Sequence, residues 1–211
     1  MSFQQIDFAS WEREEHFHHY YTAVPCSYSI TAELDVTTLQ KHVKERGLSF
    51  YPVMIHGIAK IVNRHKEFRM TLNTENTVGY FDVVPPSYTV FHPDSETFSS
   101  LWTLYQEDFG SFYAQYLEDQ KTYGSKRQFE PKKTREDVFC ISCIPWLSYT
   151  SFQLNLPKGN DYLLPIFTFG KFTQKGPLLS LPFSLQIHHA ACDGFHVARF
   201  IHELQAWANT F

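Results

Sequence analysis

The chain has 211 residues, of which 43% are hydrophobic, 19% charged and 17% aromatic, a composition typical of a folded globular protein. Its formal net charge of −4 argues against a nucleic-acid binder that works by neutralising phosphates. No apolar run approaches the roughly 20 residues of a membrane helix. The first residues, MSFQQIDFASWEREEHF, lack the basic and apolar regions of a secretory signal. We therefore expect a cytoplasmic protein with no membrane segment.

Helix and strand patterns alternate along the first half of the chain. Residues 10–20 are predicted to be helical, with Ser10 as the capping residue. Residues 26–34 alternate between apolar and polar side chains, which predicts a half-buried strand. A short helix is expected at 37–47, and a second helix is expected to begin near Pro52. Short strands are then predicted at 68–73, 77–83, 87–92 and 97–102.

The second half begins with a predicted amphipathic helix at 107–123 and ends with a helix from about residue 195. Between them, strands are predicted at 138–144, 147–155, 164–172 and 178–189. Gly176-Pro177 indicates a hairpin turn between the last two strands. Consecutive strands with short turns, and helices that come in clusters, predict a single α+β domain over residues 1–211. Its sheet is expected to be mixed, mostly antiparallel, with helices packed against it.

The segment 186–194, Gln-Ile-His-His-Ala-Ala-Cys-Asp-Gly, carries the strongest chemical signal. Strand alternation puts His189 on the apolar face and points His188 toward more polar surroundings. An imidazole in apolar surroundings resists protonation, so His189 is expected to be neutral at pH 7 and able to accept a proton. Asp193 can cap the final helix and Gly194 permits a tight turn. The same residues also fit a capped helix after a strand that ends in two histidines.

His-His-x-x-x-Asp-Gly at a strand end resembles the signature of coenzyme A-dependent acyltransferases, a group that includes chloramphenicol acetyltransferases, dihydrolipoyl acyltransferases and condensation domains. The longer stretch at 186–200 resembles the type A chloramphenicol acetyltransferase family in particular. The resemblance covers essentially the whole chain. Further matching stretches are WEREEHF at 11–17, FYPVM at 50–54, ETFS at 96–99, and Ile141-Ser142 followed by Pro145-Trp146.

In that family the second motif histidine is the general base, and the resemblance assigns this role to His189. It implies that this base takes the proton of the 3-hydroxyl of chloramphenicol, whose oxygen then attacks the thioester of acetyl-CoA without an acetyl-enzyme. Ser142 matches the serine that donates a hydrogen bond to the oxyanion, a contact that contributes about 3–4 kcal/mol. Thr168 matches a threonine that holds a water near the intermediate. The resemblance implies no tightly bound cofactor, with acetyl-CoA as co-substrate.

The resemblance makes Asp193 a structural residue and not the third member of a catalytic triad. It pairs this aspartate with Arg13, which can grip a carboxylate through two parallel hydrogen bonds. The ring of His189 is expected to be held by its own backbone carbonyl.

Two binding surfaces and an oligomer also follow from the resemblance. For coenzyme A, Lys171 matches a lysine near the ribose phosphate, and Phe172 matches a tyrosine that stacks on adenine. The family is a homotrimer with active sites between subunits. The positions that match its chloramphenicol pocket are Tyr20, Val24, Cys26, Phe98, Phe129, Phe152 and Leu154.

Four other interpretations remain to be weighed. An acetyltransferase of another hydroxylated small molecule and a ligand-binding paralogue without turnover are the main alternatives. Cys140-Ile-Ser-Cys143 has a redox or zinc spacing, but residues three apart on a strand face opposite sides. Because a cytoplasmic protein is expected, the cysteines Cys26, Cys140, Cys143 and Cys192 are expected to be free thiols. The histidines lack an acid/His spacing, so no metal site is expected.

Overall fold

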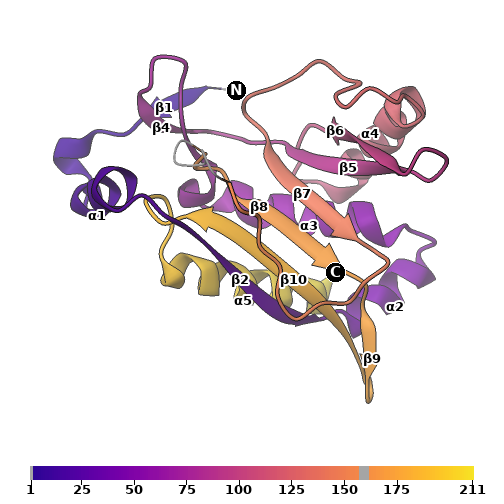
Figure 1. Cartoon of the computed structure of the whole chain (residues 1–211). Helices are drawn as coiled ribbons and strands as arrows, with labels where there is room; N and C mark the ends of the chain where they lie inside the picture. The colour runs from indigo at the N-terminus through magenta and orange to yellow at the C-terminus, as the bar shows by residue number, and fades with distance from the viewer. Residues whose placement is uncertain (1, 157–161) are drawn as a thin grey trace.

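The main sheet positions the residues of interest (Figure 1). The computed structural model describes residues 2–156 and 162–211. In this part of the chain the strand order is β2-β10-β8-β7-β5-β6, and β9 pairs with one end of β10. β5, β7 and β8 are parallel neighbours, and the other pairs are antiparallel. The strands are β2 (Ser27–Asp35), β5 (Pro86–His92), β6 (Thr97–Trp102), β7 (Phe139–Ile144), β8 (Ile166–Gly170), β9 (Thr173–Lys175) and β10 (Leu178–His188).

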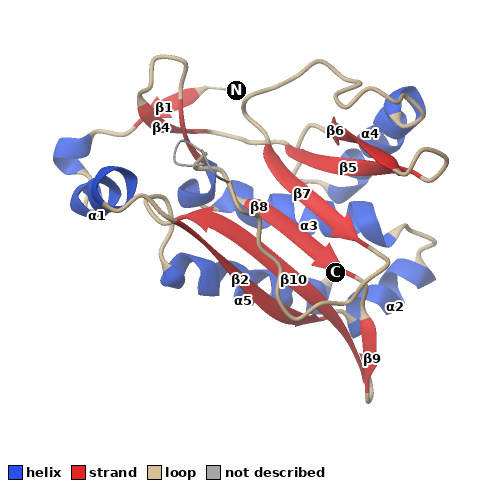
Figure 2. Ribbon diagram, in the orientation of Figure 1, coloured by secondary structure: helices blue, strands red, loops and turns tan. Residues whose placement is uncertain are grey.

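Helices cover one face of this sheet (Figure 2). A smaller sheet has the order β1-β4-β3, from β1 (Phe3–Gln5), β4 (Val78–Phe81) and β3 (Met70–Leu72). None of the helices in the described residues combines the length and apolar character needed to traverse a bilayer. The α-helices are α1 (Glu14–His18), α2 (Thr37–Glu45), α3 (Phe50–Arg64), α4 (Phe109–Tyr123) and α5 (Gly194–Thr210), and the short helical turns are η1 (Phe8–Ser10), η2 (His19–Ala23) and η3 (Lys66–Arg69).

Aromatic side chains join the sheet to the last helix. Phe200 of α5 stacks on Phe167 of β8 and Phe183 of β10, with ring centroids 4.9 and 6.1 Å apart. All three side chains are fully buried, and burial of one such side chain contributes about 1.5–3 kcal/mol. Since side chains alternate along a strand, the next residues, Thr168 and Ser184, point to the opposite face of the sheet. That face carries the polar residues described below.

The α+β class, the mixed sheet and the hairpin at Gly176-Pro177 predicted from the sequence are confirmed. The strand predicted at 147–155 is wrong, because this segment runs over the sheet without joining a ladder. Its backbone instead bonds to side chains: the Phe152 N–H donates to Oγ1 of Thr31 at 3.3 Å, and the Leu154 N–H donates to Oε1 of Gln186 at 2.8 Å. An alternating sequence pattern does not reveal that partners of this kind replace a neighbouring strand.

The helix predicted at 10–20 is confirmed for residues 14–20, but its expected start at Ser10 is wrong. The chain forms η1, α1 and η2 in turn, and η2 has π-helical geometry. Ser10 does not cap α1, since its hydroxyl donates to the carboxylate of Asp7 at 2.8 Å. The π turn changes the direction in which side chains leave the helix, and such turns are frequent at functional sites.

One close helix contact can be tested by substitution. A Cβ on Gly57 of α3 would lie 2.3 Å from the ring of Trp207 on α5. We predict that Gly57→Ala lowers the free energy of unfolding by about 1–3 kcal/mol through overpacking. In a Trp207→Leu background the cost should shrink, because the ring is gone and alanine favours a helix by about 1 kcal/mol over glycine. Thermal unfolding of the wild type, the two single variants and the double variant measures the coupling between the two positions. If Gly57→Ala lowered the free energy of unfolding equally with and without the Trp207 ring, the contact would be contradicted.

Candidate active site

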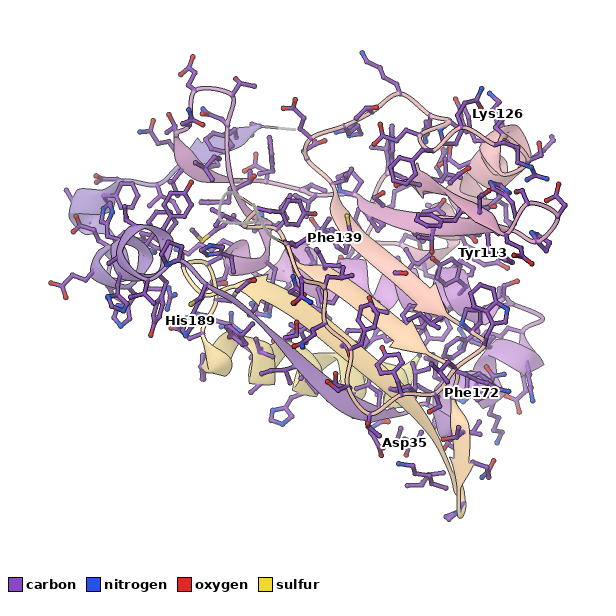
Figure 3. The ribbon with its side chains drawn as sticks, in the orientation of Figure 1. Asp35, Tyr113, Lys126, Phe139, Phe172 and His189 are labelled. Atoms are coloured by element: carbon purple, nitrogen blue, oxygen red, sulfur yellow. The ribbon has the colours of Figure 1, made fainter. Side chains whose placement is uncertain are left out.

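His189 lies directly after β10, at the end of the strand (Figure 3). Its backbone N–H donates to the carbonyl of Cys26 at 2.9 Å. The imidazole stacks face to face on the ring of Tyr20, with centroids 3.6 Å apart and an interplanar angle of 7°. The ring of Tyr28 lies 5.1 Å away on another side. The π turn therefore places an aromatic ring directly over this imidazole, which leaves 28% of the His189 side chain exposed.

Neither ring nitrogen of His189 makes a hydrogen bond to a described residue. Nδ1 is buried without such a partner and lies 3.4 Å from Oδ1 of Asp193. The expected hydrogen bond to the carbonyl of His189 itself is not formed, because Nδ1 faces the carboxylate. His188 is buried, with 1% of its surface exposed, and its Nδ1 accepts a hydrogen bond from the Ala190 N–H at 3.2 Å. The expectation that His188 points toward more polar surroundings stays a prediction.

Arg13 and Asp193 form a two-pronged ion pair next to this imidazole. Nη1 and Nη2 of Arg13 each donate to one carboxylate oxygen, and the Nη2–Oδ1 distance is 3.1 Å. Nη2 also donates to the carbonyl of Ala190 at 3.4 Å. Burial alone would raise the pKa of Asp193, but the hydrogen bond and charge of Arg13 outweigh it and lower this pKa. The carboxylate is thus ionised at neutral pH and fixed to the N-terminal helical region.

A row of hydroxyl side chains lies in the middle of the sheet. Strand register aligns Thr31, Ser184, Thr168 and Ser142 in one row across β2, β10, β8 and β7. The Thr31 and Ser184 hydroxyls share a hydrogen bond of 2.6 Å. The hydroxyl of Ser142 makes no hydrogen bond to a described residue and is available as a donor.

The histidine and the serine lie far apart within one chain. His189 is five residues beyond Ser184, the β10 member of the polar row. At about 3.3 Å per residue, this is a separation of roughly 16 Å along the strand. A bond-forming step needs reacting atoms about 3–3.5 Å apart. The His189 and Ser142 regions of one chain are therefore too far apart to contact the same pair of reacting atoms.

The predicted chloramphenicol-pocket residues fall into three groups. Tyr20, Val24 and Cys26 surround the start of β2, and the ring and backbone contacts above place Tyr20 and Cys26 beside His189. Phe152 and Leu154 line a small cavity with Thr168, Ser184 and Gln186. Phe98 and Phe129 contact each other, with centroids 5.8 Å apart. Val24, Phe98 and Phe129 are 52%, 49% and 61% exposed, so large apolar surfaces face outward.

The predicted coenzyme A residues lie beyond the C-terminal end of β8. Lys171 is exposed, and the ring of Phe172 makes an edge contact with Phe50 at 5.7 Å. Figure 3 shows Phe172 and His189 at opposite ends of the sheet. Within a single chain, these residues are on the side of Ser142 and Thr168 and not on the side of the histidine.

Three residues that the sequence did not single out contribute to this region. Tyr28 packs on the imidazole and donates from its hydroxyl to the carbonyl of Cys192 at 3.2 Å. It also lines a cavity of about 300 Å³ together with Ser27, Ser29 and residues 153–156. Glu67 and His196 contact the loop that follows β10. Tyr28 lies in the strand predicted at 26–34, whose alternating pattern indicated that one of its faces is buried. Nothing in the sequence links Glu67 to the loop after β10.

No cluster of three metal-ligating side chains occurs among residues 2–156 and 162–211. The four cysteines are free thiols, and burial raises the pKa of Cys143 to about 12. A thiol held in its protonated form is a poor nucleophile and metal ligand.

Comparison with known proteins identifies the family. A chloramphenicol acetyltransferase of Clostridium perfringens is 48% identical over the full length of both chains, and one of Clostridioides difficile is 50% identical over 97% of this chain and 95% of the other. A solved chloramphenicol acetyltransferase has a TM-score of 0.90 at 22% identity, covering 98% of this chain and 99% of its own. The dihydrolipoamide acetyltransferase of Azotobacter vinelandii has a TM-score of 0.69 at 20% identity, covering 93% and 86%.

The fold is shared with solved acyltransferases, and the chain is an acyltransferase enzyme. The family model for chloramphenicol acetyltransferase matches residues 1–205. The chain belongs to the chloramphenicol acetyltransferase family.

The lowered pKa of Asp193 predicts how its contribution to stability depends on pH. Because the folded-state pKa lies below the ordinary value of 3.8, the ionised carboxylate stabilises the fold above about pH 4 and loses this effect as the pH falls through the folded-state pKa. Asp193→Asn removes the titrating group. We expect it to be less stable than the wild type at pH 6, with a difference that shrinks toward pH 3. Thermal unfolding over this pH range measures the difference, and a constant value would contradict the assignment.

Proposed function

We propose that this enzyme transfers the acetyl group of acetyl-CoA to the 3-hydroxyl of chloramphenicol and thereby inactivates the antibiotic. The observation that carries the proposal is the imidazole of His189, which is stacked on Tyr20, partly exposed, and without a hydrogen bond from either nitrogen to a described residue. Such a ring is fixed in place and free to accept a proton. Relatives of 48% and 50% identity that bear the name chloramphenicol acetyltransferase support the choice of substrate.

The proposed reaction is a direct transfer. His189 removes the proton of the 3-hydroxyl while the oxygen attacks the thioester carbonyl carbon, which forms the C–O bond. The resulting oxyanion accepts a hydrogen bond from Ser142, whose hydroxyl has no other partner among the described residues. Thr168, the register neighbour of Ser142, is proposed to hold a water there. Collapse of the intermediate breaks the C–S bond, and the imidazolium returns the proton to the coenzyme A thiolate.

The ionised Asp193 is proposed to support this cycle without exchanging a proton. Its two oxygens are occupied by Arg13, so the carboxylate primarily holds the loop that carries the histidine. Its distance of 3.4 Å from Nδ1 of His189 also favours the imidazolium that forms during the transfer.

We further propose that the working enzyme is a homotrimer with each active site shared by two copies. The separation of roughly 16 Å between the His189 and Ser142 regions of one chain requires a second chain to bring them together. The exposed apolar side chains of Val24, Phe98 and Phe129 are suited to cover such an interface. A head-to-tail contact of this kind closes into a ring when the rotation is threefold.

Acetyl-CoA is proposed to bind near the end of β8, in the chain that supplies Ser142. The exposed Lys171 can attract a phosphate, and the ring of Phe172 can stack on adenine. The chloramphenicol pocket is proposed to combine Tyr20, Val24 and Cys26 with the other pocket residues across the interface. We place the enzyme in the cytoplasm, and its four free thiols fit a reducing compartment.

The activity is tested with purified protein, acetyl-CoA and chloramphenicol. We expect release of free coenzyme A thiol, detected with a thiol-reactive dye. His189→Ala should lower turnover by about 10²–10⁴-fold, the usual contribution of a general base. The exposed His16 provides the matched control, and His16→Ala should retain full activity. Thiol release with another alcohol but not with chloramphenicol would overturn the substrate, and a fully active His189→Ala protein would overturn the base.

The shared site is tested by mixing two inactive variants. His189→Ala and Ser142→Ala are each expected to be nearly inactive. Unfolded together and refolded, random threefold mixing should recover about a quarter of wild-type sites, because each mixed ring contains one interface with both groups intact. Ser142→Ala mixed with itself should recover none. If His189 and Ser142 of one chain formed the site, the mixture would also recover none, and the proposal of a shared site would fail.

A further inference from the structure

The loop between β10 and α5 is held by a second cluster of side chains that the reaction scheme does not use. His196 lies in the first turn of α5 and is buried, and its Nδ1 accepts a hydrogen bond from the Asp193 N–H at 2.9 Å. Glutamate or glutamine is the usual residue for this bond at a helix N-terminus. Because Nδ1 accepts, the proton of the neutral ring is on Nε2.

Glu67 of η3 lies on the far side of this histidine. Its Oε1 is 3.8 Å from Nε2 of His196, and its Oε2 accepts a hydrogen bond from Nη2 of Arg199 at 3.2 Å. Its backbone carbonyl accepts a hydrogen bond from the thiol of Cys192 at 3.5 Å. Glu67 therefore contacts the loop through its backbone carbonyl, and its carboxylate lies near Nε2 of His196.

These contacts fix Asp193 from two directions. Arg13 holds the side chain, and His196 holds the backbone N–H of the same residue. His189 lies four residues earlier in this tight loop, and its ring nitrogen is 3.4 Å from the carboxylate. A shift of the Asp193 backbone therefore displaces the surroundings of the imidazole directly.

We propose that His196, which lies beside the Glu67–Arg199 ion pair and accepts a hydrogen bond from the Asp193 N–H, is a positioning residue for acetyl transfer that fixes the loop carrying His189. This inference rests on the proposed function, in which His189 is the base. Burial lowers the pKa of His196, while the facing charges act in both directions: Glu67 and Asp193 raise it, and Arg13 and Arg199 lower it. The ring therefore remains neutral at pH 7 and keeps Nδ1 as an acceptor.

The test compares His196→Gln with His196→Leu. Glutamine can reach back to the Asp193 N–H as in a capping box, whereas leucine has no acceptor. His196→Leu should lower kcat about 10- to 10²-fold, the effect of a small misplacement of reacting groups, with the KM values of both substrates unchanged. His196→Gln should restore most of kcat. The exposed His202 on the same helix is the control, and His202→Leu should match the wild type.

Hydrogen exchange separates this inference from the proposed function. The amide of Asp193 should exchange faster in His196→Leu than in the wild type, and His196→Gln should slow it again. The inference is overturned if the Asp193 amide of His196→Leu exchanges at the wild-type rate. It is also overturned if this amide exchanges faster while the kcat of His196→Leu is unchanged. An equal loss of kcat in both variants overturns it as well. A wild-type enzyme that does not acetylate chloramphenicol instead overturns the proposed function. If His196→Leu does not fold, His196→Ala takes its place with the same expectations.

Discussion

The bidentate pair between Arg13 and Asp193 joins parts of the chain that are 180 positions apart. A partly buried carboxylate is stabilised by a partner of opposite charge, and Arg13 of the N-terminal helical region is such a partner. The π turn that follows Arg13 along the chain also places Tyr20 against the imidazole. The Arg13–Asp193 ion pair thus joins the loop after β10 to the N-terminal helical region, which also supplies the Tyr20 ring that stacks on His189.

The alternation of the central strands explains how one sheet supports both packing and chemistry. Phe167 and Phe183 face the helices, so Thr168 and Ser184 must face the other side. Register then aligns these hydroxyl residues with Ser142 of β7. The same geometry keeps this row of hydroxyl side chains away from the end of β10, where His189 lies.

The sequence predicted much of this arrangement because the relevant signals are local. The local pattern identified β10, which ends one residue before His189, and the His-His-x-x-x-Asp-Gly resemblance suggested the Arg13 partner. The strand predicted at 147–155 failed because its backbone bonds to Thr31 and Gln186, which no local pattern reveals. The contribution of His196 was missed for a related reason. Its bond resembles a capping box, but histidine replaces the residue types that define that pattern.

The segment at 147–156 has a consequence for how the enzyme family diversifies. It crosses the sheet as irregular backbone fastened by a few side-chain acceptors, without the fixed pairing of a ladder. An inserted or deleted residue in a paired strand reverses every later side chain, whereas the same change here alters only a local stretch. Natural selection can therefore change the length of this segment while the sheet beneath it stays unchanged.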